Sequence, residues 1–169
     1  DGGLFVPETI PVLTAEQIKG WTDADYRQRA AEILGLYLTD YGREDLAQCV
    51  RNAYRGDTFS SEEIAPVTDL GDGLHVLELW HGPTCAFKDM ALQILPRLMT
   101  AALQHTGEKK EIVILTATSG DTGKAALEGF KDVPGTRIMV FYPRKGVSRM
   151  QMLQMVTQEG SNARVVAVE

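Results

Sequence analysis

The sequence has few cysteines, few aromatic residues and no long apolar run, and these shortages exclude several classes of protein. Its 169 residues include only two cysteines, Cys49 and Cys85, too few for a disulfide framework. No apolar stretch approaches the roughly 20 residues of a membrane-spanning helix, and the N-terminus lacks the layout of a signal peptide. We therefore expect a cytoplasmic protein, in a reducing setting, with no membrane partner.

Positive charge is also in short supply. The chain has 17 Lys and Arg against 23 Asp and Glu, a net charge of −6, with the two signs interspersed. Nucleic-acid-binding proteins usually show a basic stripe, and no cluster of His, Cys, Asp or Glu has the spacing of metal ligands. We expect neither a nucleic-acid partner nor a metal site. The length is sufficient for one well-buried domain, or for one domain with an appendage.

The first part of the chain reads as helical and polar. Apolar positions at helical spacing predict a helix over 23–38, capped by Thr22, and a second helix over 43–54. Two short strands over 67–80 flank Gly71-Asp72-Gly73, which indicates a β-hairpin. We interpret residues 1–80 as a small helical segment followed by this hairpin.

The second part, residues 81–169, alternates strands and helices. Apolar residues over 86–99 recur at helical spacing, but Pro96 should kink or split that helix. Beyond it the predicted elements are a strand over 112–116, a helix over 120–130, a strand over 137–142, a helix over 148–159 with a Ser148/Gln151 capping box, and a strand over 164–168. This order gives two βαβ crossovers, so we expect an α/β domain with a parallel sheet and flanking helices.

A lysine follows a Gly-Pro turn in the segment Trp80–Asp89, which reads WHGPTCAFKD. Lys88 lies near the start of a predicted helix, and Phe87 and Met90 surround it with apolar surface. A neutral amine in such a place can form an imine with a carbonyl cofactor. The alternative is an ordinary surface lysine, which is what most lysines are.

A second motif, Ala117–Gly123 (ATSGDTG), joins a strand to a helix. Free backbone N–H groups and small polar side chains in such a loop can hold a carboxylate or phosphate. A P-loop is excluded, because only two residues separate Gly120 and Gly123. The alternative is a tight turn in which Ser119 simply caps the helix.

Weaker candidates lie around these two motifs. Arg144 and Lys145 precede a helix and form a possible second anion site, although a solvated loop is the more common meaning of such a pattern. From the sequence alone, His81 reads as a histidine hydrogen-bonded to backbone within a turn. We expect Thr84 to cap the lysine helix and Cys85 to serve in packing.

In this order, the two motifs resemble those of threonine synthase, a family of pyridoxal-phosphate (PLP) enzymes with the tryptophan-synthase-β-like fold. The resemblance begins at Asp1–Glu8 (DGGLFVPE), runs through the lysine and ATSGDTG motifs, and ends at Val165–Glu169, so it covers nearly the whole chain. It implies half of a three-layer PLP fold of type II.

The resemblance also implies roles for the motif residues. Lys88 would hold PLP and shuttle protons, and Asp121 would lie near the ring oxygen of the cofactor. Ser119, Gly120, Thr122 and Gly123 would bind the anionic groups of the substrate. His81, which lies next to the lysine in the family motif, would contact the substrate or relay protons. The implied reaction converts O-phosphohomoserine and water to threonine and phosphate. The alternatives are a serine/threonine dehydratase-like lyase and a non-catalytic domain that binds a phosphorylated metabolite or a partner.

Compared with the family, the chain is expected to be a fragment. It does not begin with Met, its last residues read as a strand, and it stops before the Gly-rich loop that should hold the PLP phosphate. Most of the second domain is also missing from it. The chain alone is therefore expected to be inactive and not to retain PLP, and the sequence gives no oligomeric state.

Overall fold

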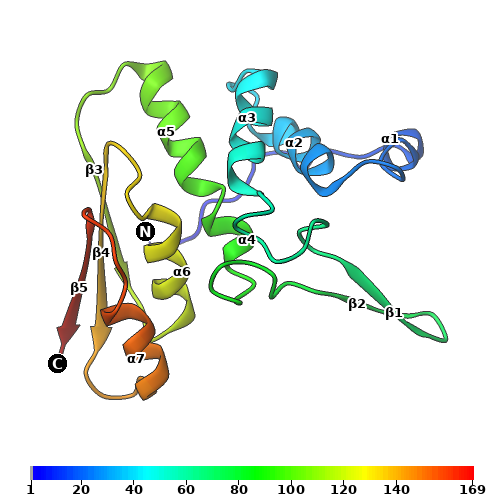
Figure 1. Cartoon of the computed structure of the whole chain (residues 1–169). Helices are drawn as coiled ribbons and strands as arrows, with labels where there is room; N and C mark the ends of the chain where they lie inside the picture. Colours follow the sequence, from blue (N-terminus) through cyan, green and yellow to red (C-terminus); the bar gives the residue numbers. More distant parts are fainter. Residues whose placement is uncertain (1) are drawn as a thin grey trace.

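The computed structural model of the chain describes residues 2–169; Asp1, the first residue of the expected opening motif, lies outside the described residues. Figure 1 shows a helical N-terminal half, a protruding hairpin and a small sheet with helices packed on it. The elements in chain order are α1 (Ala15–Gly20), α2 (Tyr26–Tyr37), α3 (Arg43–Ala53), β1 (Val67–Gly71), β2 (Leu74–Leu77), α4 (Asp89–Leu92), α5 (Leu95–Thr106), β3 (Ile112–Ala117), α6 (Asp121–Phe130), β4 (Thr136–Pro143), α7 (Arg149–Val156) and β5 (Ala163–Val168).

The sheet is parallel, with strand order β3-β4-β5. Ile114 lies opposite Ile138 in one pair, and Val140 lies opposite Val165 in the other. Helix α6 connects the first pair and α7 the second, as the two predicted crossovers require. The expected α/β class is confirmed: a parallel sheet flanked by helices follows an N-terminal helical segment and an antiparallel hairpin.

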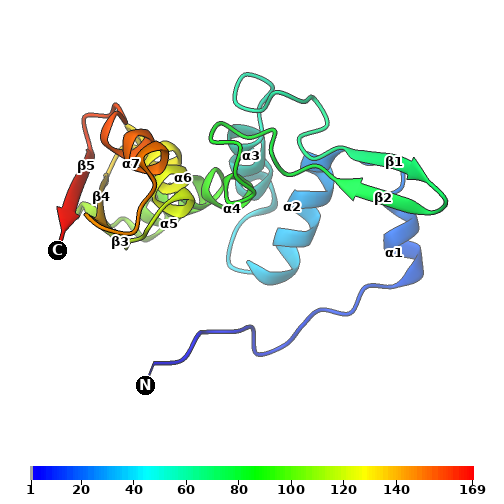
Figure 2. The same cartoon turned by 90° about the horizontal axis from the view of Figure 1, so that it is seen from below.

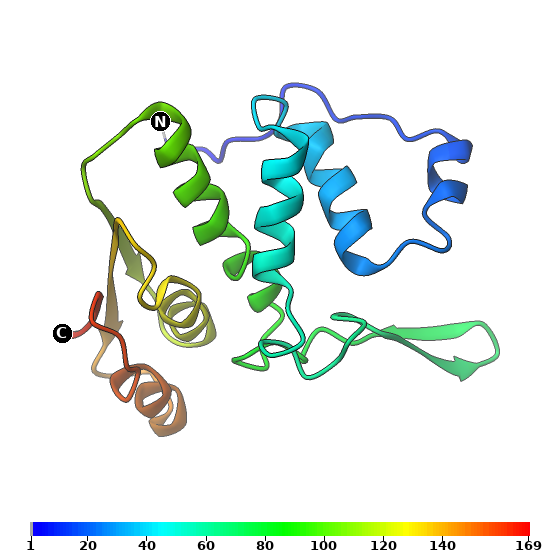
Figure 3. The ribbon, with the colours of Figure 1, turned by 45° about the horizontal axis from the view of Figure 1, so that its top comes forward.

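One face of this sheet carries the helices. Ile138 and Val140 of β4 are buried beneath α6, together with Leu127, Phe130 and Met155. On the opposite face Val113 and Leu115 are 56% and 67% exposed. The helices of residues 2–169 lie to one side of the sheet (Figures 1 and 3), so these residues supply the sheet and one helical layer.

A second hydrophobic cluster joins the N-terminal helices to α5. Val50, Ala53, Tyr54, Phe59 and Ile64 are buried in it, and Ile94 between α4 and α5 completes it. Figure 3 shows α5 lying between α3 and α6. The N-terminal arm before α1 is extended and runs apart from the helices (Figure 2), and its Leu4 and Phe5 are fully or almost fully exposed.

Several boundaries differ from the predictions. The expected cap Thr22 is wrong, because its hydroxyl donates to Lys19 O at the end of α1 and Asp25 caps α2 through a box with Gln28. Sequence reasoning missed α1, although Thr14 and Gln17 form a capping box there. The split at Pro96 is confirmed, since α4 ends at Leu92 and Pro96 lies in the first turn of α5. The box between Ser148 and Gln151 is also confirmed.

None of the helices in the described part of the chain is both long enough and apolar enough to cross a membrane.

Candidate functional site

Lys88 occupies the N-cap position of α4. Its side chain is partly buried, and its Nζ lies 4.3 Å from the centroid of the Phe87 ring. Within residues 2–169, no hydrogen bond or ion pair is formed by this amine. A lysine that is neither paired nor fully solvated is available for covalent chemistry.

The turn that carries Lys88 is held by the next residue, Asp89. This carboxylate is completely buried and accepts hydrogen bonds from the backbone N–H and the hydroxyl of Thr84, at 2.8 and 2.7 Å. Gly82 packs directly on it, because a Cβ at that position would lie 2.5 Å from Asp89 Cβ. Asp89 therefore closes the loop from Gly82 to Lys88 into a compact unit.

Two expectations about this loop are wrong. Thr84 does not cap the lysine helix, because its hydroxyl donates to a residue of the first turn and the N-cap is Lys88. Cys85 does not serve in packing. Its side chain is exposed, and its backbone has a φ of 58°, in the left-handed region, which turns the chain sharply after Thr84.

Replacing Asp89 by asparagine should destabilise the fold in a pH-dependent way. The amide loses an acceptor for Thr84, at a cost of about 1–3 kcal/mol. Burial raises the pKa of Asp89 above its ordinary value, so the folded state binds this proton more tightly than the unfolded chain does. Ionisation of the wild-type Asp89 carboxyl thus lowers the free energy of unfolding at a pH above its folded-state pKa. This stability returns as the pH falls through that pKa and the carboxyl is protonated. Urea denaturation at about pH 7 and about pH 5 should show Asp89→Asn losing more stability, relative to wild type, at the lower pH; an equal loss at both would contradict the assignment.

His81 lies at the start of the same loop but bonds away from Lys88. Its Nδ1 lies 3.0 Å from Ser60 Oγ, and its Nε2 lies 2.6 Å from Glu78 Oε2. Hydrogen bonds from Thr68 and His81 lower the pKa of Glu78. Sequence reasoning missed Ser60 and Glu78, which fix the ring of His81 from two sides.

The Ser119–Gly123 loop lies at the C-terminal end of β3, where α6 begins. Gly120 is the N-cap of α6 and no side chain caps this helix, so the alternative in which Ser119 caps it does not hold. Gly120 is buried, whereas Ser119 and Asp121 are exposed. In the described structure the N–H groups of Ser119, Asp121 and Thr122 have no hydrogen-bond acceptor. An uncapped helix start of this kind attracts an anion.

Gln151 of α7 joins this loop to the next one, and no sequence signal beyond its capping box pointed to it. Its Nε2 lies 3.3 Å from Asp121 Oδ1, while its Oε1 accepts from the Ser148 hydroxyl at 3.1 Å. The β4–α7 loop therefore lies beside the Ser119–Gly123 loop. Arg144 and Lys145 of that loop are exposed, and neither side chain makes an ion pair or hydrogen bond within the described part.

Helices α4 and α6 bring the two motifs onto packed elements. A Cβ on Gly129 of α6 would lie 2.0 Å from the carbonyl oxygen of Leu92, so the backbones of the two helices are in direct contact. Lys88 begins α4 and Gly120 begins α6. The structure thus fixes the lysine and the open helix start on one rigid pair of elements.

Replacing Gly120 by valine should impair anion binding far more than stability. A Cβ there would lie 2.5 Å from Gln151 Nε2, the end of a flexible side chain that can move aside. The branched side chain would still block close approach of a ligand to the loop backbone. We expect kcat/KM of the full-length protein to fall by about 10²-fold, with a melting temperature close to wild type.

Gly20→Val is the matched control, because a Cβ on Gly20 would meet nothing within 4 Å. Equal activity of Gly120→Val and wild type would refute a binding role for the loop.

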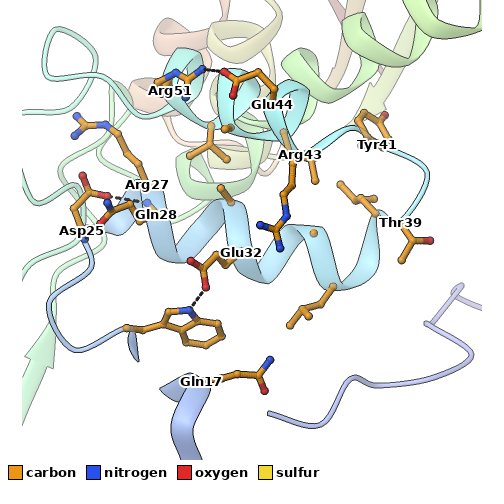
Figure 4. Close-up of a pocket in the computed structure, with 18 residues that line it drawn as sticks. Gln17, Asp25, Arg27, Gln28, Glu32, Thr39, Tyr41, Arg43, Glu44 and Arg51 are labelled. Atoms are coloured by element: carbon orange, nitrogen blue, oxygen red, sulfur yellow. Dashed lines mark hydrogen bonds and ion pairs between the residues drawn. The ribbon is translucent and has the colours of Figure 1, made fainter. Parts of the chain in front are cut away.

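A cavity lies elsewhere, among the N-terminal helices. It has a volume of about 840 Å³ between α1, α2 and α3, and none of the candidate residues lines it. Figure 4 shows two of the interactions among its lining residues, between Glu32 and Trp21 and between Arg51 and Glu44. Lys88 and the Ser119–Gly123 loop therefore lie outside this cavity.

Over the described residues, no group of three or more His, Cys, Asp or Glu side chains could hold a metal ion.

Comparison with known proteins identifies the family that this geometry resembles. A family model described as "Threonine synthase N terminus" matches residues 1–54. Threonine synthase from Pseudomonas aeruginosa is 39% identical over 170 residues, covering 100% of this chain, and threonine synthase-like 2 from Xenopus laevis is 36% identical over 171 residues, also covering 100%. A PLP-bound threonine synthase from Brucella melitensis superimposes with a TM-score of 0.88 and 37% identity over 99% of this chain.

The chain spans only part of each of these proteins. It covers 35% of the Pseudomonas and Xenopus proteins and 36% of the Brucella structure. The resemblance drawn from the motifs is confirmed along the whole chain, and it is a resemblance to the N-terminal portion of threonine synthases.

Proposed function

We propose that this chain is the N-terminal portion of a threonine synthase, which uses PLP to convert O-phosphohomoserine and water to threonine and phosphate. The observation that carries the proposal is that the chain has both a Lys88 amine without a hydrogen bond and an uncapped helix start at α6. These two groups lie on packed helices and occur in a sequence similar to threonine synthases throughout.

The residues present fit one part of a PLP site. Lys88 offers the amine that would hold the cofactor, on a turn fixed by Asp89. Asp121 has an exposed carboxylate at the open start of α6, and this carboxylate would lie near the ring oxygen of the cofactor. When bound, PLP supplies an electron sink for the carbon atoms of the substrate.

The chain's own residues bind the substrate and move its protons. In the proposed reaction Lys88 would hold the cofactor, and its amine Nζ would transfer protons at Cα and Cβ of the substrate. The backbone N–H groups of Ser119 and Thr122, with Gly120 and Gly123 allowing close approach, bind the anionic groups of the substrate.

His81, Arg144 and Lys145 are proposed as secondary contacts of the substrate. The two cations lie on the β4–α7 loop, which Gln151 ties to Asp121, so they can approach an anion held at the start of α6. The contacts of its two ring nitrogens with Ser60 and Glu78 hold His81 in one orientation beside the lysine loop. Substitution of Arg144 or Lys145 should raise KM with little effect on kcat, because these residues would act in binding alone.

The full-length protein tests the reaction directly. Incubation with O-phosphohomoserine should release phosphate and form threonine in equal amounts. A serine/threonine dehydratase-like lyase would instead release ammonia from serine or threonine, and a non-catalytic binding domain would release neither product.

The 169-residue chain by itself should not retain PLP. It contains the lysine, but we propose that the N–H groups that bind the cofactor phosphate come from the remainder of the enzyme. A lysine–aldehyde linkage without a phosphate anchor exchanges with free amines. After incubation with PLP and dialysis, the visible absorbance of the linkage should be lost. Stoichiometric retention together with phosphate release would show that this chain holds a complete site.

A further inference from the structure

A second cavity lies between α3, α5 and the loop that precedes β4. Its volume is about 230 Å³. Val133 and Pro134 line it from the loop after α6, whereas Ser119 and Gly120 lie before the start of α6. The cavity and the Ser119–Gly123 loop therefore lie at opposite ends of that helix.

Arg97 of α5 lines this cavity with a charge that nothing neutralises. Its Nε is buried without a hydrogen-bond partner, and among residues 2–169 its guanidinium forms no ion pair. Burial lowers the pKa of Arg97 from its ordinary value, and the nearby Arg55 lowers it further. Such a group is held at an energetic cost unless an acceptor reaches it.

The surroundings supply donors and no free acid. Asn52 of α3 and Gln104 of α5 line the cavity, and neither the Asn52 Nδ2 nor the Gln104 amide donates a hydrogen bond in the described part. Asp45 is the acidic side chain of the lining, and it already pairs with His105 Nε2 at 3.0 Å. Neither Asp45 nor any other acid of the described residues forms an ion pair or hydrogen bond with the Arg97 guanidinium.

A second unpaired donor lies one helical turn away. Gln93 Nε2 is buried without a partner, and Gln93 and Arg97 are four residues apart on a run with helical backbone angles from α4 into α5. Residues at this spacing share a helix face. Both of the buried side-chain atoms left unsatisfied in the described residues are thus N–H donors on one face of the same run.

We propose that the cavity between α3 and α5 binds a small oxyanion of the phosphate class through Arg97. The Nε–H and one terminal N–H of a guanidinium form a fork that matches two oxygens of a phosphate or carboxylate. The Asn52 and Gln104 amides can donate to the remaining oxygens. This site does not depend on the proposed enzymatic function.

The NMR signal of the Arg97 side chain tests the proposal at the site itself. The ¹⁵N-labelled 169-residue chain is titrated with inorganic phosphate, with sodium chloride used to hold the ionic strength constant. A parallel titration uses sodium chloride alone. The Arg97 Nε–H cross-peak, assigned by its loss in Arg97→Gln, should shift saturably with phosphate. A cross-peak that does not move, or that moves equally with chloride, overturns the proposal and leaves a cavity occupied by water.

Asn52→Asp provides an independent variant that keeps Arg97. The carboxylate has the shape of the amide and preserves the acceptor for Gln48 Nε2. The new carboxylate should form an ion pair with the Arg97 guanidinium and so compete with phosphate. The phosphate affinity measured from the Arg97 Nε–H signal should then fall by at least about tenfold. Unchanged affinity in this variant would contradict the site.

Arg29→Gln is the matched control, because Arg29 is exposed on α2 and its removal changes the net charge equally. Its phosphate affinity at the Arg97 signal should equal that of wild type. Phosphate bound at the Ser119–Gly123 loop would shift the amide signals of that loop, so the two sites are read separately in one titration.

Discussion

Replacing Lys88 by alanine in the full-length enzyme is expected to abolish turnover, with a loss of more than about 10³-fold in kcat. In the proposed mechanism this amine is both the covalent tether of PLP and the group that moves protons, so no other side chain replaces it. The fold should survive, because Lys88 makes no hydrogen bond or ion pair in the described structure. The melting temperature of the variant should therefore stay near that of wild type.

The tether can be located chemically. Full-length protein with PLP is reduced with borohydride and digested, and the modified peptide is found by mass. The adduct should lie on Lys88 and disappear in Lys88→Ala. Lys110→Ala, a change at an exposed lysine, should keep both the adduct and the activity. An adduct on any other lysine would overturn the assignment.

Replacing Gly129 by alanine is expected to destabilise the fold by more than about 3 kcal/mol. The added Cβ would lie 2.0 Å from the carbonyl oxygen of Leu92, and this contact is with backbone, which cannot rotate away. Relief requires α4 and α6 to separate, which opens the packing of Leu92 against the α/β cluster. Urea denaturation of the 169-residue chain measures the loss.

Gly35→Ala is the matched control for this change. Gly35 is also within a helix, but the nearest atom to its added Cβ is Leu46 Cδ1 at 3.9 Å. Alanine there should be neutral or stabilise by less than about 1 kcal/mol, because it reduces the freedom of the unfolded chain. Similar stabilities for the two variants would show that α4 and α6 are not held in close contact.

The predicted elements of the sheet were those with strong local signals. β3 and β5 are β-branched runs bounded by turn residues, and α6 begins directly after the Ser-Gly turn, so periodicity was sufficient to find them. The short helix α1 escaped because its six residues bury nothing and carry no apolar stripe, leaving only the Thr14/Gln17 capping box as a signal.

The site was predicted by motif and not by contact. The position of Lys88 at a helix start and the Ser119–Gly123 loop at a strand end followed from local pattern. The roles of Glu78 and Gln151 did not, because each depends on partners that the folded chain brings close. Gln151 reaches Asp121 across thirty positions of sequence, a pairing that no single-sequence pattern contains.

The run from α4 to α5 belongs to both hydrophobic clusters at once. Ile94 is buried among the N-terminal helices, with Met90 and Leu98 packed beside it, whereas Leu92 and Met99 pack on the α/β cluster. The two clusters therefore share the run from α4 to α5. If either cluster unfolds, this run loses the packing on one of its faces, which weakens the other cluster. Unfolding should then be a single cooperative transition. A loss of packing at Val50 should therefore also destabilise the turn that carries Lys88.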